Sequence, residues 1–246
     1  MPPILPQTVL RRYRVVENAP IADGQFKLVV EAVDANERVP EFKAGQWVYI
    51  HLLNPDGSDW ARAAYSIVSA PSDGSHRIEF GIKMAGDFTK RAAALRVGDE
   101  LNLQGPWGVF GCKPEQPRHV MIAGGIGVTP FIAIIREAIA ANTKGHEFIL
   151  FYSVRTPEEA AYLAELKSIA AAHPHIRIVA TSTRGTSPDW KEETGRLSEV
   201  LFDRHLSDYA TGEYLLCGPK EFMQAMRDLL VVKGADPKRI KQELFG

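Results

Sequence analysis

The alternation of apolar and polar residues divides the chain into two parts with different periods. From Arg11 to about Leu103, apolar residues recur at every second position between turn residues, which is typical of half-buried strands. Strands are expected at 13–17, 26–31, 47–53, 64–69, 77–83 and 101–104. Six short strands over this length predict a small antiparallel β-barrel.

One helix interrupts the barrel pattern. The run 88–95 predicts it, and the turn Val97-Gly98-Asp99 ends it. The proline-containing segment 113–118 then predicts a linker, so we expect two domains, residues 1–113 and 118–246.

From His119 onward, short apolar runs alternate with helical patterns. Strands are expected at 119–123, 147–154, 176–182, 213–217 and 240–244, and helices at 130–141, 157–171, 197–206 and 219–233. Strictly alternating strands and helices predict an α/β domain with an open parallel five-stranded sheet, whose ligands bind beyond the carboxyl ends of the strands. Thr129 is expected to cap the first of these helices, and Thr156-Pro157-Glu158-Glu159 predicts a capping box on the second.

The segment His119–Pro130 carries the strongest local signal. An apolar strand leads into the turn Gly125-x-Gly127-x-x-Pro130 and then into an apolar helix. Such a turn exposes backbone N–H groups at the positive end of the helix dipole, where a phosphate can bind. A purely structural turn is the alternative, because proline stands where the usual dinucleotide fingerprint has its third glycine.

Composition and charge exclude several classes of protein. The net charge is −1 and the pI about 6.7, so no basic surplus favours nucleic acid or an anionic membrane. No apolar run is long enough for a membrane span, and residues 1–6 do not resemble a signal peptide. Two cysteines and scattered histidines predict neither a disulfide scaffold nor a metal site. We therefore expect a soluble, cytoplasmic protein, with any metal-cluster electron carrier on another chain.

The stretch 62–69 combines a cation, an aromatic ring and a hydroxyl. Arg62 can bind a phosphate, Tyr65 can stack on a planar ring, and Ser66 can form a hydrogen bond with a ring nitrogen. An ordinary strand with one exposed charge is the alternative. Beside a dinucleotide-type domain, the combination predicts a flavin site.

Together with further motifs in the same order, this stretch resembles the ferredoxin–NADP reductase family over nearly the whole chain. The motifs are Arg62…Tyr65-Ser66, Gly86-Asp87-Phe88-Thr89, Gly105-Pro106-Trp107-Gly108-Val109-Phe110, Gly124-Gly125-Ile126-Gly127-Val128-Thr129-Pro130, Cys217-Gly218-Pro219 and Glu243-Leu244-Phe245. The resemblance implies a flavoprotein that binds FAD in the barrel and a nicotinamide nucleotide in the α/β domain.

The resemblance also implies roles for residues of the barrel. Tyr65 would pack against the flavin ring, Ser66 would form a hydrogen bond near its N5 atom, and the helix after Gly86 would hold the pyrophosphate. The implied FAD-binding residues are Arg62, Ala63, Ala64, Tyr65, Ser66, Ile82, Lys83, Gly86, Phe88 and Thr89. The family has arginine where this chain has Ala63. Because a one-residue shift reverses the direction of a strand side chain, either a bulge re-aims Arg62 or another group binds the phosphate.

In the second domain, the resemblance places Cys217 beside the nicotinamide, where a small side chain lets two flat rings approach. A buried core cysteine is the alternative. Glu243 would assist protonation or orient Ser66, and Phe245 would cover the flavin until nicotinamide displaces it. The implied catalytic residues are Ser66, Cys217 and Glu243, and the nucleotide would also contact Gly125, Gly127, Val128, Thr129, Gly218 and Pro219.

NADPH is the expected nucleotide. The second strand of this domain ends in Val154-Arg155, with no carboxylate for the ribose of NAD. By resemblance, Thr183 (or Ser182), Arg184 and Arg196 would bind the 2′-phosphate, with Lys191 as a weaker candidate, and Arg155 is also expected to contact the nucleotide. Solvated loop charges neutralised by Glu192 and Glu193 are the alternative.

The expected activity is electron transfer between NADPH and a one-electron carrier such as ferredoxin or flavodoxin, through FAD, by a monomer. Three alternatives stay open. The chain can be the reductase component of an oxygenase, a reductase of free flavin or another small acceptor, or a flavin-binding subunit of a larger complex without independent turnover.

Overall fold

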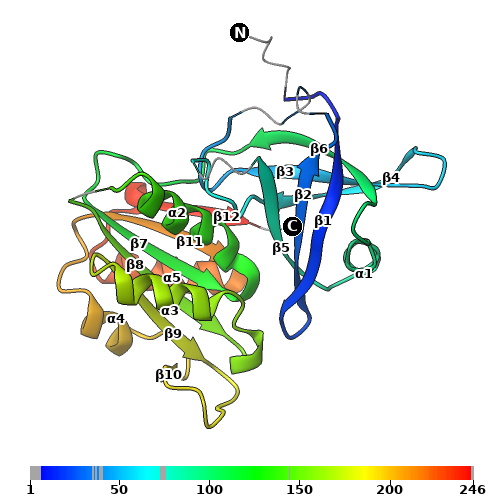
Figure 1. Cartoon of the computed structure of the whole chain (residues 1–246). Helices are drawn as coiled ribbons and strands as arrows, with labels where there is room; N and C mark the ends of the chain where they lie inside the picture. Colours follow the sequence, from blue (N-terminus) through cyan, green and yellow to red (C-terminus); the bar gives the residue numbers. More distant parts are fainter. Residues whose placement is uncertain are drawn as a thin grey trace. The chain divides into compact units, whose positions relative to one another are not determined.

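The computed structural model describes residues 7–34, 36, 38, 41–72, 76–143 and 145–244 (Figure 1). The chain divides into two compact units, residues 1–109 with 132–141, and residues 110–131 with 142–246. The expected division into an FAD-binding domain, residues 1–113, and a nucleotide-binding domain, residues 118–246, stays a proposal.

The first unit is built on an antiparallel sheet. Its strands are β1 (Arg11–Ala22), β2 (Gln25–Ala32), β3 (Trp47–Leu53), β4 (Asp59–Ser66), β5 (Arg77–Lys83) and β6 (Glu100–Trp107), in the order β4-β3-β6-β1-β2-β5. The edge strands β4 and β5 contact each other, and the Val68 N–H beyond β4 donates to the Glu79 carbonyl at 2.9 Å. The sheet therefore curls into the predicted barrel.

Alternating side chains of these strands fill the barrel. Tyr13, Leu28, Ile50, Phe80 and Leu103 are among its fully buried residues. The expected strand 64–69 is displaced, because β4 begins at Asp59 and ends at Ser66. β4 is an edge strand with little apolar alternation, whereas the apolar residues just after it are buried without continuing the ladder with β3.

The barrel helix α1 (Asp87–Ala93) lies beside β4, close to its predicted position (Figure 1). The Thr89 hydroxyl accepts hydrogen bonds from the N–H groups of Ala85 and Gly86, at 2.8 and 3.0 Å, and donates to the Gly86 carbonyl. At the other end, the Asn18 side-chain amide donates to the Ala92 carbonyl at 3.0 Å. Side chains therefore satisfy backbone groups at both ends of this short helix.

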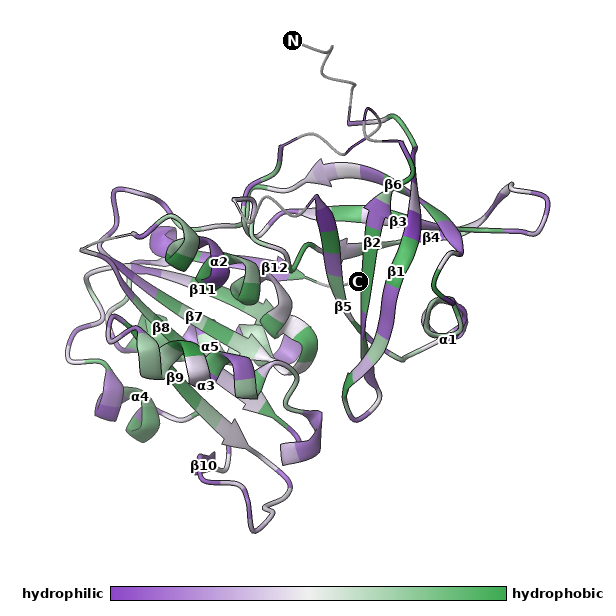
Figure 2. Ribbon diagram, in the orientation of Figure 1, coloured by the Kyte–Doolittle hydropathy of each residue, from purple (hydrophilic) through white to green (hydrophobic). Residues whose placement is uncertain are grey.

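The second unit is built on a parallel sheet. Its strands are β7 (Arg118–Gly124), β8 (Glu147–Val154), β9 (Ile176–Ser182), β10 (Glu193–Thr194), β11 (Glu213–Gly218) and β12 (Ile240–Leu244), in the order β10-β9-β8-β7-β11-β12. All five predicted strands are present, and the central ones are mainly hydrophobic (Figure 2). The sixth strand, β10, has two residues, too few to produce a periodic pattern.

Helices connect these strands. They are η2 (Gly125–Val128), α2 (Thr129–Ala140), η3 (Pro157–Glu159), α3 (Leu163–Ala172), α4 (Glu199–His205), α5 (Lys220–Val232) and η4 (Pro237–Arg239), where η marks a 3-10 helix. Helices α4 and α5 share one hydrophobic core with the sheet, through Phe202 and Met223 among others. Helix α3 contacts β9.

The expected helix 157–171 is broken, and the predicted capping box is wrong. The Thr156 side chain forms no cap hydrogen bond, the chain makes only a 3-10 turn at 157–159, and α3 starts after Tyr162, which has φ = 60°. The intervening Ala161 is fully buried. Tertiary packing of this alanine therefore overrides its high helix propensity.

Thr129 does not act as the expected N-cap. It is the first residue of α2, and its hydroxyl donates to the Ile126 carbonyl at 3.0 Å. The glycine turn folds as the 3-10 helix η2, so the chain is already helical when it reaches Thr129.

Candidate functional site

Three glycines let the carboxyl ends of β7 and β11 approach closely. A Cβ on Gly127 would lie 2.4 Å from the Cys217 carbonyl oxygen, and a Cβ on Gly218 would lie 3.0 Å from Gly124. A Cβ on Gly124 would meet the Phe222 ring at 2.9 Å. Only glycine therefore fits at these positions without movement of the backbone or a ring.

The other predicted residues of this turn lie around the same strand ends. Gly125 has φ = +57°, and nothing lies within 4 Å of its Cβ position, so its backbone borders open space. Val128 and Thr129 are buried, and Pro219 is the residue before α5. The predicted residues of β7, η2 and β11 are thus brought together at the sheet edge where an open α/β sheet binds its ligand.

Cys217 and Glu243 are neighbours across the β11–β12 ladder. Cys217 is fully buried, and burial, with the Glu243 carboxylate adding to it, raises the pKa of its thiol well above the ordinary value. Burial also raises the pKa of Glu243 to about 7. The thiol therefore stays protonated at neutral pH, whereas the carboxyl can hold or release a proton there.

Glu243 carries an unsatisfied buried atom. Its Oε2 atom is shielded from solvent and has no hydrogen-bond partner among the described residues. A buried polar atom without a partner is rare and is often found at functional sites. Phe245, the other predicted residue of this segment, lies outside the described residues.

Three exposed arginines lie at the ends of neighbouring strands. Arg155 follows β8, Arg184 follows β9, and Arg196 comes two residues after β10. Backbone hydrogen bonds join these segments, because Arg184 N–H donates to the Arg155 carbonyl at 2.8 Å and Gly195 N–H donates to the Ser182 carbonyl at 2.8 Å. The parallel pairing of β10 with β9 therefore places Arg196 at the same edge of the sheet as Arg184. Arg155 lies at this edge as well, although it is 41 positions from Arg196 in the sequence.

None of these three arginines forms an ion pair with another residue in the described part of the chain. The nearby acids have other partners, since Glu192 pairs with Lys167 and Glu193 pairs with Arg204. Neutralisation of the arginines by Glu192 and Glu193 is therefore not what the structure shows.

The hydroxyls expected beside them are already engaged. Ser182 is buried and its hydroxyl donates to the Gly185 carbonyl at 2.6 Å, and the Thr183 hydroxyl donates to the Val154 carbonyl at 3.2 Å. The Lys191 ammonium donates to the Pro188 carbonyl. Arginine side chains are therefore the main donors that this edge presents.

In the barrel, Tyr65 and Ser66 lie at the end of β4. Tyr65 is half-buried against the barrel core, and burial raises its pKa to about 12. Ser66 is 3% exposed, and its hydroxyl has no hydrogen-bond partner among the described residues. A buried hydroxyl without a partner beside a partly exposed aromatic ring fits a planar ligand with ring nitrogens.

Other residues predicted for FAD lie on β4, β5 and α1. Ala63 and Ala64 precede Tyr65 on β4, and Ile82 and Lys83 end β5. Gly86 and Thr89 form the start of α1 described above, and the Phe88 ring stacks on the Tyr65 ring at 5.9 Å. Arg62 lies on the same strand but on the face opposite Tyr65, where its guanidinium lies over the Tyr49 ring at 4.6 Å.

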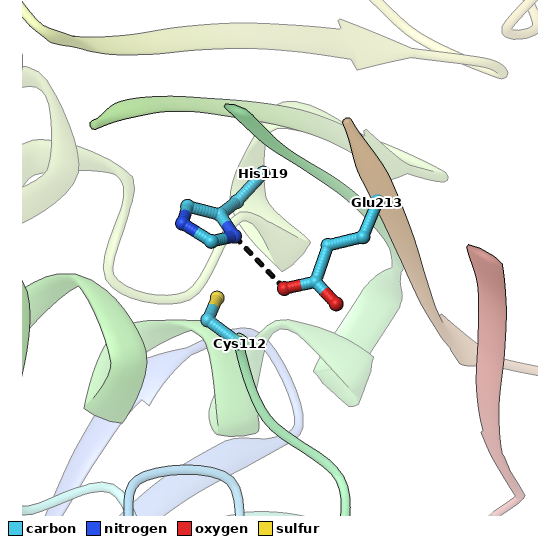
Figure 3. Close-up of side chains that lie close together, drawn as sticks. All are labelled: Cys112, His119 and Glu213. Carbon is cyan, nitrogen blue, oxygen red and sulfur yellow. Dashed lines mark hydrogen bonds and ion pairs between the residues drawn. The ribbon is translucent and has the colours of Figure 1, made fainter. Parts of the chain in front are cut away.

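A buried polar cluster in the second unit was not predicted from sequence. Cys112, His119 and Glu213 each have one atom that could act as a metal ligand, and these three atoms lie within 4.8 Å of one another (Figure 3). His119 and Glu213 share a hydrogen bond of 2.9 Å, and the Lys241 ammonium lies 3.2 Å from the second Glu213 oxygen. The available signal was a polar, titratable residue at or near the start of each apolar strand, at His119 and Glu213.

The cluster is best explained as an ion-pair network. Burial favours the neutral acid, but hydrogen bonds from His119 and from the Lys113 N–H, together with the Lys241 ammonium, lower the pKa of Glu213. Lys241 also donates to the Gly111 carbonyl at 2.6 Å. Because a lysine already balances the carboxylate, we interpret the cluster as an anchor that holds residues 111–113 on the sheet.

Comparisons with known proteins identify both domains of the chain. The oxidoreductase FAD-binding domain model matches residues 32–111, and the oxidoreductase NAD-binding domain model matches residues 121–228. The fold and these two matches define a two-domain flavoprotein that uses a nicotinamide nucleotide.

A relative that matches over nearly its whole length identifies the family. The chain is 34% identical to ferredoxin–NADP reductase B of Sorangium cellulosum over 225 residues, which cover 88% of this chain and 89% of that protein. It belongs to the ferredoxin–NADP reductase-like family and is an FAD-dependent NAD(P)H oxidoreductase that transfers electrons.

Two other similar proteins contain additional sequence. The chain is 30% identical to the glycine betaine monooxygenase reductase subunit of Chromohalobacter salexigens, over 83% of this chain but 56% of that protein. It superimposes with a TM-score of 0.82 and 26% identity on the flavohemoglobin of Malassezia yamatoensis, covering 97% of this chain and 60% of that one. In the described part of the chain, no helix is long and apolar enough to cross a membrane.

Proposed function

We propose that the protein oxidises NADPH and passes the electrons through FAD to a one-electron carrier. The preference for NADPH rests on the three exposed arginines, Arg155, Arg184 and Arg196, that end neighbouring strands without an ion-pair partner among the described residues. A guanidinium binds a phosphate through two parallel hydrogen bonds, so these arginines suit the 2′-phosphate that distinguishes NADPH from NADH.

The residues of the barrel fit FAD. When bound, FAD supplies a hydride acceptor that can give up its electrons singly. Tyr65 offers a partly buried ring for stacking, and the Ser66 hydroxyl, which lacks a partner among the described residues, can donate to a ring nitrogen. We expect one non-covalent FAD in the purified protein, and mass identification of FMN instead would contradict this assignment.

Residues of the second unit have complementary tasks. Gly124, Gly127 and Gly218 let the ends of β7 and β11 pack closely, and the open space beside Gly125 lets a nucleotide approach the backbone of the turn. Cys217 presents a small neutral side chain, and Glu243 can hold a proton near neutral pH. We propose that Cys217 borders the nicotinamide and that the Glu243 carboxyl binds and releases a proton next to it.

The nucleotide preference can be tested with matched arginine variants. We compare kcat/KM for NADPH and NADH in the wild type and in Arg184→Ala and Arg196→Ala. Each substitution should lower the value for NADPH by roughly ten- to hundred-fold, because a hydrogen bond to a charged group contributes about 1.5–3 kcal/mol. Values for NADH should change little.

Arg204→Ala is the matched control. Arg204 is an exposed arginine of the same unit, but it forms a bidentate ion pair with Glu193 at 2.9 and 3.1 Å. Its removal should leave the NADPH preference intact. The assignment would be refuted if the wild type preferred NADH. It would also be refuted if kcat/KM for NADPH fell as much in Arg204→Ala as in the other two variants.

We propose ferredoxin or flavodoxin as the acceptor class, and the name of the Sorangium relative supports ferredoxin. The name of the Chromohalobacter relative supports the alternative, a reductase component of an oxygenase. Rates of NADPH oxidation with a ferredoxin, a flavodoxin and free FMN separate these acceptors from a free-flavin reductase. The monomeric state and the cytoplasmic location stay predictions.

A further inference from the structure

The arginine of the family motif has no direct counterpart on the Tyr65 face of β4. From Ala61 to Ser66, β4 pairs with β3 without a shift in register, and the irregularity in this ladder lies earlier, between Leu52 and Leu53. No bulge therefore turns Arg62 toward Tyr65. Its guanidinium lies over Tyr49 and 3.4 Å from the Gln104 side chain, on the opposite face of the strand.

Another arginine lies on the Tyr65 side. The Phe88 ring of α1 stacks between the Tyr65 and Trp60 rings, at 5.9 and 6.3 Å with interplanar angles of 23° and 18°. The Arg91 guanidinium lies 4.5 Å above the Trp60 ring. The aromatic stack therefore leads from the flavin residue Tyr65 to a cation, one helical turn beyond Phe88.

Arg91 is held in place. Its Nη2 group donates to the Leu53 carbonyl at 2.7 Å, and its side chain is half-buried. A guanidinium has five N–H donors, and this bond uses one of them. The neighbouring Lys90 is exposed and lies 3.9 Å from Asp87, so it offers a weaker and less ordered charge.

Two backbone N–H groups at the start of α1 are already engaged, so a side-chain donor is needed there. The N–H groups of Ala85 and Gly86 already bind the Thr89 hydroxyl. These two amides are therefore not available to a pyrophosphate near this helix, and the amides that remain without an intrahelical partner are those of residues 87–89. A planar cation from the same helix is the chemical replacement.

We infer that Arg91 binds the pyrophosphate of FAD in place of the arginine that is missing at Ala63. This inference rests on the proposed placement of FAD beside Tyr65 and Ser66. Arg91 supplies the charge from α1 rather than from β4, and the Trp60 ring and the Leu53 carbonyl orient its guanidinium. Arg62 takes no part in binding the phosphates.

The test uses the full chain freed of flavin and compares FAD with riboflavin, which has the same ring system and no phosphate. Binding of each flavin is followed by quenching of its fluorescence. Arg91→Ala should raise the Kd for FAD about ten- to hundred-fold and change the Kd for riboflavin less than about twofold. Arg62→Ala is the matched control on the other face of β4 and should change neither Kd.

Arg91→Met keeps most of the side-chain volume over Trp60 and should lose FAD affinity as Arg91→Ala does, while its circular dichroism and Tm stay near those of the wild type. Unchanged FAD affinity in both Arg91 variants, equal losses for FAD and riboflavin, or a loss of FAD in Arg62→Ala would each overturn the inference. If the wild type bound neither flavin, the proposed placement of FAD itself would fail, which is a different result from a wild type that binds FAD without needing Arg91.

Discussion

The buried carboxyl of Glu243 makes stability depend on pH in an unusual direction. Burial raises its pKa from 4.5 to about 7 in the folded protein, and the unfolded chain keeps the ordinary value. Between these two pH values the folded state binds more protons than the unfolded state. The free energy of unfolding therefore falls as pH rises from about 4.5 to about 7, and Glu243→Gln should remove this loss.

The size of the effect follows from the two pKa values. The difference between 4.5 and about 7 corresponds to at most about 3 kcal/mol, at 1.36 kcal/mol for each pH unit. Glu243 is partly exposed, and water reduces the penalty, so we expect about 1–2 kcal/mol. For a protein of this size, that is a change of roughly 2–8 °C in Tm.

The assay is thermal unfolding of wild type and Glu243→Gln at intervals from pH 4.5 to pH 8. The two Tm curves should meet near pH 4.5 and separate as pH rises, with the glutamine variant more stable at pH 7 and above. Glu158→Gln, at an exposed glutamate of the same unit, should follow the wild type at every pH. Parallel curves for the wild type and Glu243→Gln would show that the carboxyl is not desolvated.

Two further predictions concern the ends of β7 and β11. Gly127→Ala would place a Cβ 2.4 Å from the Cys217 carbonyl oxygen, so we expect a loss of about 1–3 kcal/mol, or roughly 2–12 °C in Tm. Gly185→Ala, whose nearest neighbour would be 3.8 Å away, should stay within about 0.5 kcal/mol of the wild type, and an equal Tm for both variants would contradict the close approach. Cys217→Ser should slow the bleaching of bound flavin by NADPH in rapid mixing while flavin content stays unchanged. A wild-type rate in this variant would leave Cys217 with a packing role alone.

Hydropathy periods predicted most of the fold because burial follows them closely. The parallel strands are buried on both faces, so β7 appears as an apolar run, and the barrel strand β5 alternates as a half-buried strand should. Their predicted bounds agree with the structure to within a residue.

Features that depend on packing between distant segments could not be predicted. Ala160-Ala161 favours a helix locally, but burial of Ala161 and the left-handed Tyr162 break it. Likewise, nothing in the local sequence shows that the Ser182 hydroxyl binds the Gly185 carbonyl, or that Glu193 pairs with Arg204. Sequence can name residues suited to a phosphate, but only the structure shows which of them already have partners.

The role inferred for Arg91 suggests how a motif can change while its chemistry is kept. A phosphate requires a cation at a point in space, and several elements can deliver a side chain to that point. In β4 the pleat fixes Arg62 on the Tyr49 face, so no rotamer change can replace the residue lost at Ala63. Helix α1 can place a cation on the Tyr65 side instead. Arg91 follows Phe88 by three positions and so lies on the same helical face as the ring that stacks on Tyr65. Loss of an arginine from a strand motif therefore does not predict loss of the pyrophosphate contact when a helix packed on that strand carries a cation at this spacing.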